Sequence, residues 1–173
     1  HHGNELDPVG VPPALAGDVE AVAVCLLHAD VDPRHEQAVA AALRASGHDV
    51  SASHEVAPEF REYERTVTTV LNAYLRPACG AYLRSLTPMA DTVAVMTSAG
   101  GLVTVEEAAV TPALLLLSGP AGGARAAAAV ARANGFATAL SFDMGGTSTD
   151  VCLILDGHPP PAAQRDVAGL PVR

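Results

Sequence analysis

The residues best suited to chemistry lie in one short stretch of this 173-residue chain. An apolar run ends at Asp143, two glycines and three hydroxyl residues follow, and Asp150 opens a second apolar, β-branched run. This pattern is typical of a strand, a tight loop and a second strand, with a carboxylate at each mouth of the loop. The loop residues between the carboxylates are Gly145, Gly146, Thr147, Ser148 and Thr149.

A loop of this composition is suited to bind phosphate. Glycines let backbone N–H groups converge on an anion without a Cβ in the way, and the hydroxyl groups add donors. The carboxylates cannot contact phosphate directly, but they can hold Mg²⁺, which prefers one or two carboxylates together with phosphate oxygens. The alternative is a structural hairpin whose turn requires Gly-Gly and whose Thr and Asp side chains satisfy local backbone groups.

A second group of small residues follows a buried strand that we predict over 91–97. Ser98, Gly100 and Gly101 would place backbone donors at the carboxyl edge of a sheet, a usual position for ligands in open α/β folds. The alternative is a plain turn from strand to helix.

A third group, S-G-P-A-G-G at 118–123, precedes a helix predicted over 121–134. Free N–H groups at a helix start, together with the helix dipole, favour an anion, and Gly119 and Gly122 would belong to this site. The alternative is that Gly122 and Gly123 allow the helix to pack closely on a sheet.

The first third of the chain predicts a β-α-β unit. An uninterrupted apolar run at 21–27 indicates a strand covered on both faces, and a second short strand is expected over 49–53. Between them a helix begins with Asp32 as its cap and Pro33 at its first position, and it ends at Gly47. This order implies a parallel pair of strands.

The longest helical pattern runs over 54–86, and Pro77 is expected to kink or divide it. The charged side chains at its start, taken alone, predict a solvated cluster of ion pairs. These charged residues are Arg61, Glu62, Glu64 and Arg65. The apolar residues at helical spacing form one stripe. They are Tyr63, Val67, Val70, Leu71, Tyr74, Ala78 and Ala81.

Composition narrows the class of protein. With 10 basic and 19 acidic residues, the net charge of −9 argues against a nucleic-acid or anionic-membrane surface. Three widely spaced cysteines without a C-x-x-C pattern predict buried, reduced thiols in a cytoplasmic protein. No apolar run reaches transmembrane length, and the histidines show no metal-binding spacing.

The stretch D-M-G-G-T-S-T-D-V at 143–151 resembles the phosphate loop of the hydantoinase A/5-oxoprolinase family, within the actin-like ATPase superfamily. Residues 53–77 are similar to the family's helix that crosses from its first to its second lobe. The loops at 97–101 and 118–123 resemble the family's Q-S-N-G-G and S-G-P-A-A-G motifs. This chain departs from the family pattern at Val67, Thr97, Ala99 and Gly123.

The resemblance implies an α/β fold that is part of an actin-like, ribonuclease H-like ATPase. Residues 1–71 would form the end of the first lobe, and residues 72–173 would form the start of the second lobe with its phosphate hairpin. The family's first-lobe D-x-G-G-T-x-T-D motif and its later H-T-I-G-A-G-G-G-S loop are not in these residues, so we expect a central fragment that is inactive alone.

The resemblance also implies ATP-dependent hydrolysis of a small cyclic amide, with ATP and Mg²⁺ as cofactors. The loop from Gly145 to Thr149 would hold the phosphates, and Ser98, Gly100, Gly101, Gly119 and Gly122 would add to the nucleotide site. Asp143 and Asp150 would place the metal ion or the attacking group. A hydantoinase B-type partner subunit or domain and a homo-oligomer are expected.

Two other interpretations stay open. One is a subunit of an ATP-dependent carboxylase of the acetone or acetophenone type, which belongs to the same family and is not separated from a hydrolase by these residues. The other is a non-catalytic interaction module that keeps the ATPase scaffold. The departures at Val67, Thr97 and Ala99 favour the module, whereas the complete phosphate-loop pattern argues against it.

Overall fold

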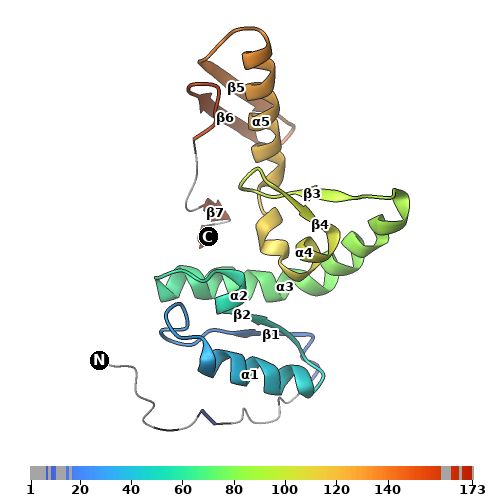
Figure 1. Cartoon of the computed structure of the whole chain (residues 1–173), viewed down its shortest axis with the longest axis vertical. Helices are drawn as coiled ribbons and strands as arrows, with labels where there is room; N and C mark the ends of the chain where they lie inside the picture. Colours follow the sequence, from blue (N-terminus) through green and yellow to red (C-terminus); the bar gives the residue numbers. More distant parts are fainter. Residues whose placement is uncertain are drawn as a thin grey trace. The chain divides into compact units, whose positions relative to one another are not determined.

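The computed structural model describes residues 7, 9–10, 15, 17–160, 165–167 and 169–172. The chain forms two compact units, one of His1–Cys79 with Gln164–Arg173 and one of Gly80–Ala163. Figure 1 shows the mixture of helices and strands from which both are built. The lobe boundary after Leu71, expected from the family resemblance, stays a prediction.

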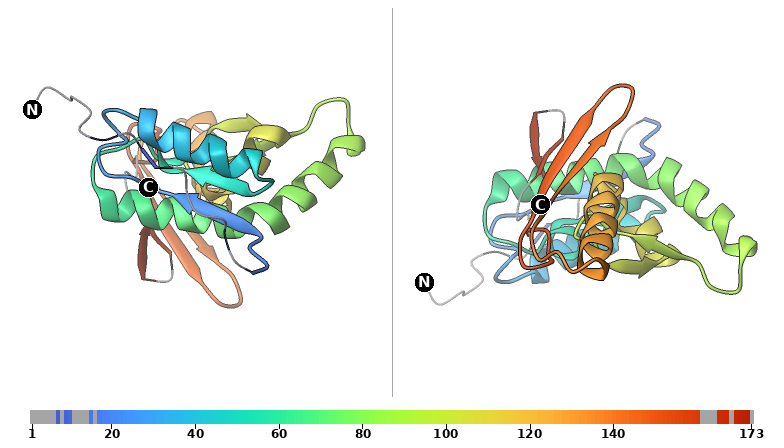
Figure 2. Two further views of the ribbon diagram at one scale, coloured as in Figure 1. Left: turned by 90° about the horizontal axis from the view of Figure 1, so that it is seen from below. Right: turned by 90° about the horizontal axis from the view of Figure 1, so that it is seen from above.

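The first unit contains the predicted β-α-β arrangement. Strand β1 (Ala21–Val24) pairs in parallel with β2 (Asp49–Ala52), and helix α1 (Arg34–Ala45) connects them. In Figures 1 and 2, α1 runs alongside this pair of strands. Pro33 occupies the cap position of α1, one residue later than predicted for Asp32, and Gly47 ends the helix with φ of +89°. The core of the unit consists of Val24, Ala40, Leu43, Val50 and Ala52.

Buried Glu36 ties the ends of this motif together. The Oε2 atom of Glu36 accepts hydrogen bonds of 2.8 Å from the Leu26 backbone N–H and the Ser53 hydroxyl. Its Oε1 atom accepts from the His54 backbone N–H at 2.8 Å and lies 2.7 Å from the His54 Nδ1 atom. One carboxylate therefore holds both the loop that follows β1 and the turn that follows β2.

Arg65 also holds this loop, and it corrects the prediction of a solvated ion-pair cluster at this position, although Arg61 and Glu64 do form an ion pair of 3.5 Å. The Arg65 side chain is 1% exposed, and it donates at 2.8 Å both to the Leu26 carbonyl and to the Asp30 carboxylate. A third bond of 3.1 Å reaches the Glu59 carbonyl. Because Asp30 lies 35 residues earlier in the chain, no local pattern indicates this pairing.

The helix predicted over 54–86 is two helices, α2 (Ser53–Val56) and α3 (Glu62–Leu86). The break follows from Pro58, which restricts the residue before it, and from Arg61, whose φ of +91° is incompatible with a helix. Helix α3 continues through Pro77, so the expected division does not occur there.

The buried side of α3 is polar in its first half, and buried Ala73 and Leu83 follow further along. Thr68, Thr69 and Asn72 are almost fully buried, and the Asn72 side chain donates to the Ser51 hydroxyl at 3.0 Å. Most of the predicted apolar stripe is exposed, with Tyr63 63% and Tyr74 78% exposed, whereas Val67 and Leu71 are half-buried. Hydrogen-bonded contacts, rather than apolar periodicity, therefore select the inner face of this helix.

The second unit begins at Gly80 with the end of α3, and a short 3-10 turn (Thr87–Met89) and a hairpin follow. Strand β3 (Ala94–Met96) pairs antiparallel with β4 (Leu102–Thr104). The small residues at 98–101 therefore form a hairpin turn, so the alternative of a strand-to-helix turn is wrong. Helix α4 (Val105–Val110) starts at a capping box built by Thr104 and Glu107, and a second 3-10 turn (Pro112–Leu115) follows.

Helix α5 (Ser118–Ala133) starts three residues earlier than predicted, and it packs on the hairpin of β5 (Ala139–Met144) and β6 (Thr149–Ile154). This hairpin confirms the predicted strand, loop and strand. A final hairpin, formed by β7 (Arg165–Val167) and β8 (Leu170–Val172), was not predicted.

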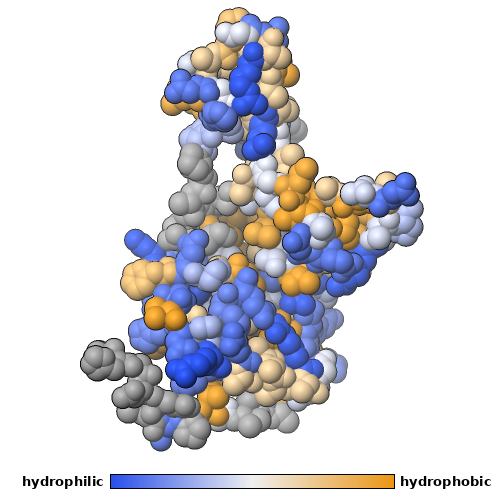
Figure 3. Space-filling view, in the orientation of Figure 1, coloured by the Kyte–Doolittle hydropathy of each residue, from blue (hydrophilic) through white to orange (hydrophobic). Residues whose placement is uncertain are grey.

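The cysteines are free, as predicted, but each is only partly buried. Among the described residues, no helix is long and apolar enough to span a membrane. Apolar side chains lie on the surface, and Figure 3 shows them gathered over β3 and β4. The outer face of the β5–β6 hairpin is also apolar, with Leu140, Phe142 and Met144 64–70% exposed. The described residues therefore expose apolar surface on both hairpins.

We expect Glu36→Gln to lower the free energy of unfolding by about 1–3 kcal/mol. Whichever carboxylate oxygen is replaced, a backbone N–H of Leu26 or His54 then faces an NH₂ group that cannot accept its hydrogen bond. Urea denaturation followed by circular dichroism measures the change. Glu20→Gln, at an exposed position, is the control and should alter stability little.

The effect of Glu36 should depend on pH. Burial alone would raise the pKa of Glu36, but the hydrogen bonds from Leu26, His54 and Ser53 outweigh it and hold the pKa below its ordinary value of 4.5. The stabilisation is therefore fully present above about pH 4.5 and is lost as the pH falls through the lower pKa of the folded state. A stability difference between wild type and Glu36→Gln that grows on acidification would contradict this assignment.

Candidate functional site

The register of the β5–β6 hairpin places the two predicted carboxylates opposite each other. Asp143 pairs with Asp150 across the strands, and Ser141 pairs with Cys152 one step further along the same face. Because side chains alternate along a strand, these four share one side of the hairpin. The Asp143 carboxylate approaches α5, with its Oδ2 atom 3.6 Å from the position that a Cβ on Gly123 would occupy.

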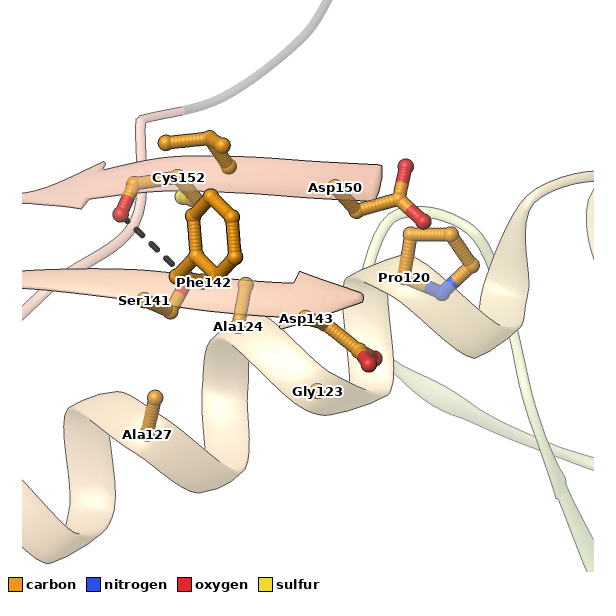
Figure 4. Close-up of a pocket in the computed structure, with 10 residues that line it drawn as sticks. Pro120, Gly123, Ala124, Ala127, Ser141, Phe142, Asp143, Asp150 and Cys152 are labelled. Atoms are coloured by element: carbon orange, nitrogen blue, oxygen red, sulfur yellow. Dashed lines mark hydrogen bonds between the residues drawn. The ribbon is translucent and has the colours of Figure 1, made fainter. Parts of the chain in front are cut away.

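A cleft of about 390 Å³ lies between this face and helix α5. Figure 4 shows the carboxylates of Asp143 and Asp150 at the end of the cleft nearest Pro120. The helix contributes small residues, and the hairpin contributes polar side chains together with Phe142 and Val151. The lining consists of Pro120, Gly123, Ala124, Ala127, Ser141, Phe142, Asp143, Asp150, Val151 and Cys152.

The loop between the carboxylates leaves backbone donors free. The Gly145 N–H donates to the Ser148 carbonyl at 2.9 Å and closes the turn. Within the described part of the chain, the N–H groups of Gly146 and Thr147 have no hydrogen-bond acceptor. These donors can therefore bind an anion.

The turn itself does not require two glycines. Neither Gly145 nor Gly146 has a positive φ, and a Cβ on Gly146 would meet no atom within 4 Å. A Cβ on Gly145 would lie 3.7 Å from the Ser148 carbonyl oxygen, which is an ordinary contact. At Gly157, by contrast, φ is +75° and a Cβ would lie 2.7 Å from the Arg132 Cδ atom. The fold explains the glycine at 157 but not the pair at 145–146.

The carboxylates of Asp143 and Asp150 have no cationic partner among the described residues. Both residues are exposed, and neither forms an ion pair with a described side chain. Like charges placed directly opposite each other on a sheet are destabilising. A divalent cation would relieve this repulsion, and two carboxylates fit Mg²⁺, which takes its other ligands from water and phosphate. No group of three or more acidic, histidine or cysteine side chains suited to a metal occurs in the described chain.

In the second predicted segment, at 98–101, two backbone N–H groups already form hydrogen bonds within the fold. The Ser98 N–H donates to the Leu114 carbonyl at 2.7 Å, and the Gly100 N–H donates to the Thr97 carbonyl at 2.9 Å. Gly100 has φ of +80°, and the Arg125 side chain packs against its Cα. Ser98, Gly100 and Gly101 do not line the cleft, so their nucleotide-binding role stays a prediction.

The third predicted segment lies inside α5 rather than before it. Gly119 is in the first turn, whereas Gly122 is in the second turn and faces the Met96 sulfur at 3.0 Å from its Cβ position. The absence of a side chain at Gly122 therefore allows close packing on β3, as the structural alternative predicted. A nucleotide contact from Gly119 or Gly122 stays a prediction.

Sequence reasoning did not find the side chains that flank the carboxylates. Ser141 and Cys152 could have been found from strand alternation, since each lies two residues from an aspartate. Ala124 and Ala127 carry no local signal, because their place depends on how α5 packs against the hairpin.

The fold and this cleft define a mixed α/β protein with a hairpin suited to bind a phosphate and a cation. Residues 65–173 match the sequence model of the Hydantoinase/oxoprolinase family, and the chain belongs to that family. The predicted family is thereby confirmed.

Two sequence relatives carry an activity in their names. The chain is 38% identical over 151 residues to caprolactamase subunit alpha of Pseudomonas jessenii, covering 81% of this chain and 21% of that protein. It is 36% identical over 150 residues to 5-oxoprolinase of Saccharomyces cerevisiae, covering 83% of this chain and 12% of that protein.

Two solved structures share the fold. The ATP-dependent caprolactamase of Pseudomonas jessenii has a TM-score of 0.66 at 34% identity, over 78% of this chain and 21% of that chain. Nucleotide-free acetone carboxylase has a TM-score of 0.68 at 27% identity, over 88% and 23%. The predicted α/β fold is confirmed as part of a larger one, because this chain spans less than a quarter of the length of each relative.

We expect Asp143→Asn and Asp150→Asn each to leave the hairpin folded and to raise the free energy of unfolding by up to about 1 kcal/mol. Each substitution removes one of two facing like charges without changing side-chain shape. Urea denaturation at low ionic strength gives the change, and added salt should reduce it. A clear loss of stability would mean that the carboxylates are structural.

Proposed function

We propose that this chain is part of an ATP-dependent hydrolase of cyclic amides, and that the β5–β6 hairpin binds the phosphates of ATP. The observation that carries the proposal is the pair Gly145 and Gly146. These glycines are not needed by the turn, and the N–H groups of Gly146 and Thr147 have no hydrogen-bond acceptor among the described residues. The names of the caprolactamase and 5-oxoprolinase relatives support the substrate class.

The residues of the loop have distinct roles in this proposal. The N–H groups of Gly146 and Thr147 donate to phosphate oxygens, and the hydroxyls of Ser148 and Thr149 are secondary donors. Gly145 gives its own N–H to the turn and serves instead by leaving room for the phosphate. ATP, when bound, supplies the phosphoryl group that activates the ring amide for hydrolysis.

Asp143 and Asp150 hold Mg²⁺ or place the attacking group. Their side chains are preorganised because the hairpin register places them side by side without a competing cation. Fixed charge and positioning supply most of the rate in phosphoryl transfer, so these residue types suit the reaction.

The rest of the nucleotide site lies on parts of the relatives that this chain does not span. We propose that residues 1–71 belong to a first lobe and residues 72–173 to a second lobe, with Ser98, Gly100, Gly101, Gly119 and Gly122 adding to the nucleotide site. The subunit name of the caprolactamase relative supports a multi-subunit assembly. We propose that the partner is a hydantoinase B-type subunit or domain and that the protein is cytoplasmic.

Sequence identity to the relatives favours a hydrolase over a carboxylase. The caprolactamase structure is 34% identical and the acetone carboxylase structure 27% identical over the matched residues. The acetophenone carboxylase gamma subunit is 31% identical, against 38% for the caprolactamase subunit. A non-catalytic module would not explain two unpaired carboxylates beside free backbone donors.

We expect Gly146→Ala to abolish ATP binding by the full-length protein while leaving its fold intact. The methyl group would occupy the space through which phosphate approaches, yet it contacts nothing within the chain. Stability should be unchanged or higher by up to about 1 kcal/mol, as for other Gly-to-Ala changes at compatible sites. Isothermal titration calorimetry with ATP and Mg²⁺ measures the affinity.

Gly10→Ala is the matched control, because its Cβ also meets nothing within 4 Å and its φ is not positive. It should bind ATP as wild type does. If Gly146→Ala kept the wild-type affinity for ATP, the proposed role of the loop would be wrong.

We expect Asp150→Asn to reduce the dependence of ATP affinity on Mg²⁺. Wild-type affinity should fall by about tenfold or more when EDTA removes the cation, because each charge-assisted contact to a cation is strong. With one carboxylate neutralised, the same removal should change the affinity less. An equal loss of ATP affinity in wild type and variant would mean that the cation binds elsewhere.

A further inference from the structure

Arg125 on helix α5 is a cation without a partner in the described part of the chain. Its side chain is exposed, and no described carboxylate or carbonyl accepts a hydrogen bond from it. Every other arginine between residues 17 and 160 contacts a carboxylate or a backbone carbonyl. These arginines are Arg34, Arg44, Arg61, Arg65, Arg76, Arg84 and Arg132. Because the chain has 19 acidic and only 10 basic residues, carboxylates are not scarce, and the unpaired state of Arg125 needs another explanation.

The Arg125 side chain is nevertheless held in place, on the turn between β3 and β4. Its Cδ atom lies 2.5 Å, and its Nη1 atom 3.3 Å, from the position that a Cβ on Gly100 would take. Any side chain at this position would displace the arginine, and the φ of +80° at Gly100 also favours glycine. A long side chain that lies against backbone has already lost much of its rotamer freedom. The guanidinium is therefore positioned over the turn before any ligand arrives.

The same turn has two backbone donors that the fold does not use. Thr97, Ser98 and Gly100 donate their N–H groups to carbonyls of this unit. The N–H groups of Ala99 and Gly101 have no acceptor among the described residues, and both residues are exposed. They flank Gly100, on which the guanidinium lies. The turn therefore combines a fixed positive charge with two free N–H groups.

We propose that Arg125 and the β3–β4 turn form a binding site for a small oxyanion, which is a phosphate or a carboxylate group. The planar guanidinium donates two parallel hydrogen bonds to two oxygens of such a group, and the N–H of Ala99 or Gly101 donates to an oxygen as well. Arg125 does not line the cleft beside Asp143 and Asp150, so the oxyanion site is distinct from the proposed cation site. The inference goes beyond the proposed function, because it holds whether or not the β5–β6 loop binds ATP.

Labelling with phenylglyoxal, which modifies guanidinium groups, tests this site in the full-length protein. Mass spectrometry gives the labelling rate of each arginine, at an ionic strength kept constant with sodium chloride. Arg125 should react readily without oxyanions, and inorganic phosphate should slow its labelling by about fivefold or more, because a guanidinium in charge-assisted hydrogen bonds is not free to react. Arg34, which is exposed and already paired with Asp32, is the internal control and should react equally with and without phosphate. An Arg125 that phosphate does not protect, or that is unreactive without phosphate, overturns the inference.

Substitution of Arg125 tests the affinity. In a Gly146→Ala background, which removes the proposed contribution of the β5–β6 loop, Arg125→Gln should weaken phosphate binding by about tenfold or more, as expected for the loss of a charge-assisted contact. Isothermal titration calorimetry measures the affinity. Arg84→Gln is the matched control, since Arg84 is an exposed arginine of the same unit whose ion pair with Glu106 is long, at 3.6 Å. Both variants should unfold at the temperature of their parent, because exposed charges contribute little to stability. Equal phosphate affinity in Arg125→Gln and its parent would refute the site.

Two further probes identify the source of the oxyanion. Protection of Arg125 by ATP with Mg²⁺ means that a phosphate of the nucleotide occupies the site. Protection by acetate but not by ATP means that the site takes the carboxylate of another small molecule. If phosphate protects Arg125 while Gly146→Ala still binds ATP, the proposed role of the loop fails and this inference stands. If Gly146→Ala loses ATP while phosphate leaves the labelling of Arg125 unchanged, the loop stands and this inference fails.

Discussion

The pairing register of β5 and β6 is the constraint on which the candidate site depends. With Asp143 opposite Asp150, the two carboxylates come side by side, and Ser141 and Cys152 turn to the same face. A shift of one residue on either strand would send one set of side chains to the apolar outer face. The register of the hairpin thus determines the position of the carboxylates, the length of the loop and which polar side chains face the cleft.

Helix α5 forms the other side of the cleft with small residues. Gly123, Ala124 and Ala127 face the strands with little or no side chain, so the helix can approach the polar face and still leave a cleft. Gly122 allows the neighbouring contact, where the Met96 sulfur lies 3.0 Å from the position that a Cβ would take. The small residues of one helix therefore have two separate purposes, close packing towards β3 and open space towards the carboxylates.

How much could be read from the sequence depended on the distance between interacting residues. The hairpin and the β-α-β unit follow from patterns of a few residues, and their strands, turns and parallel or antiparallel pairing were predicted. Helix α3 was misjudged because its inner face is chosen by distant partners, such as Asp30 for Arg65 and Ser51 for Asn72. A periodicity argument counts apolar side chains and cannot see these bonds. The cleft was missed for the same reason, since α5 and the hairpin define it jointly.

The two units differ in whether their charged side chains have partners within the fold, and this difference indicates where the site lies. In the first unit, Glu36 and Arg65 are buried, and each has several hydrogen-bond partners that hold the loop after β1. Their charges are therefore compensated by partners within the fold. In the second unit, Asp143 and Asp150 face each other without a partner among the described residues, beside a loop whose glycines the turn does not need. A fold gains nothing from such an arrangement, because like charges in register weaken the hairpin. The groups that the fold leaves unsatisfied are the groups that a cation and a phosphate would satisfy in the proposed function.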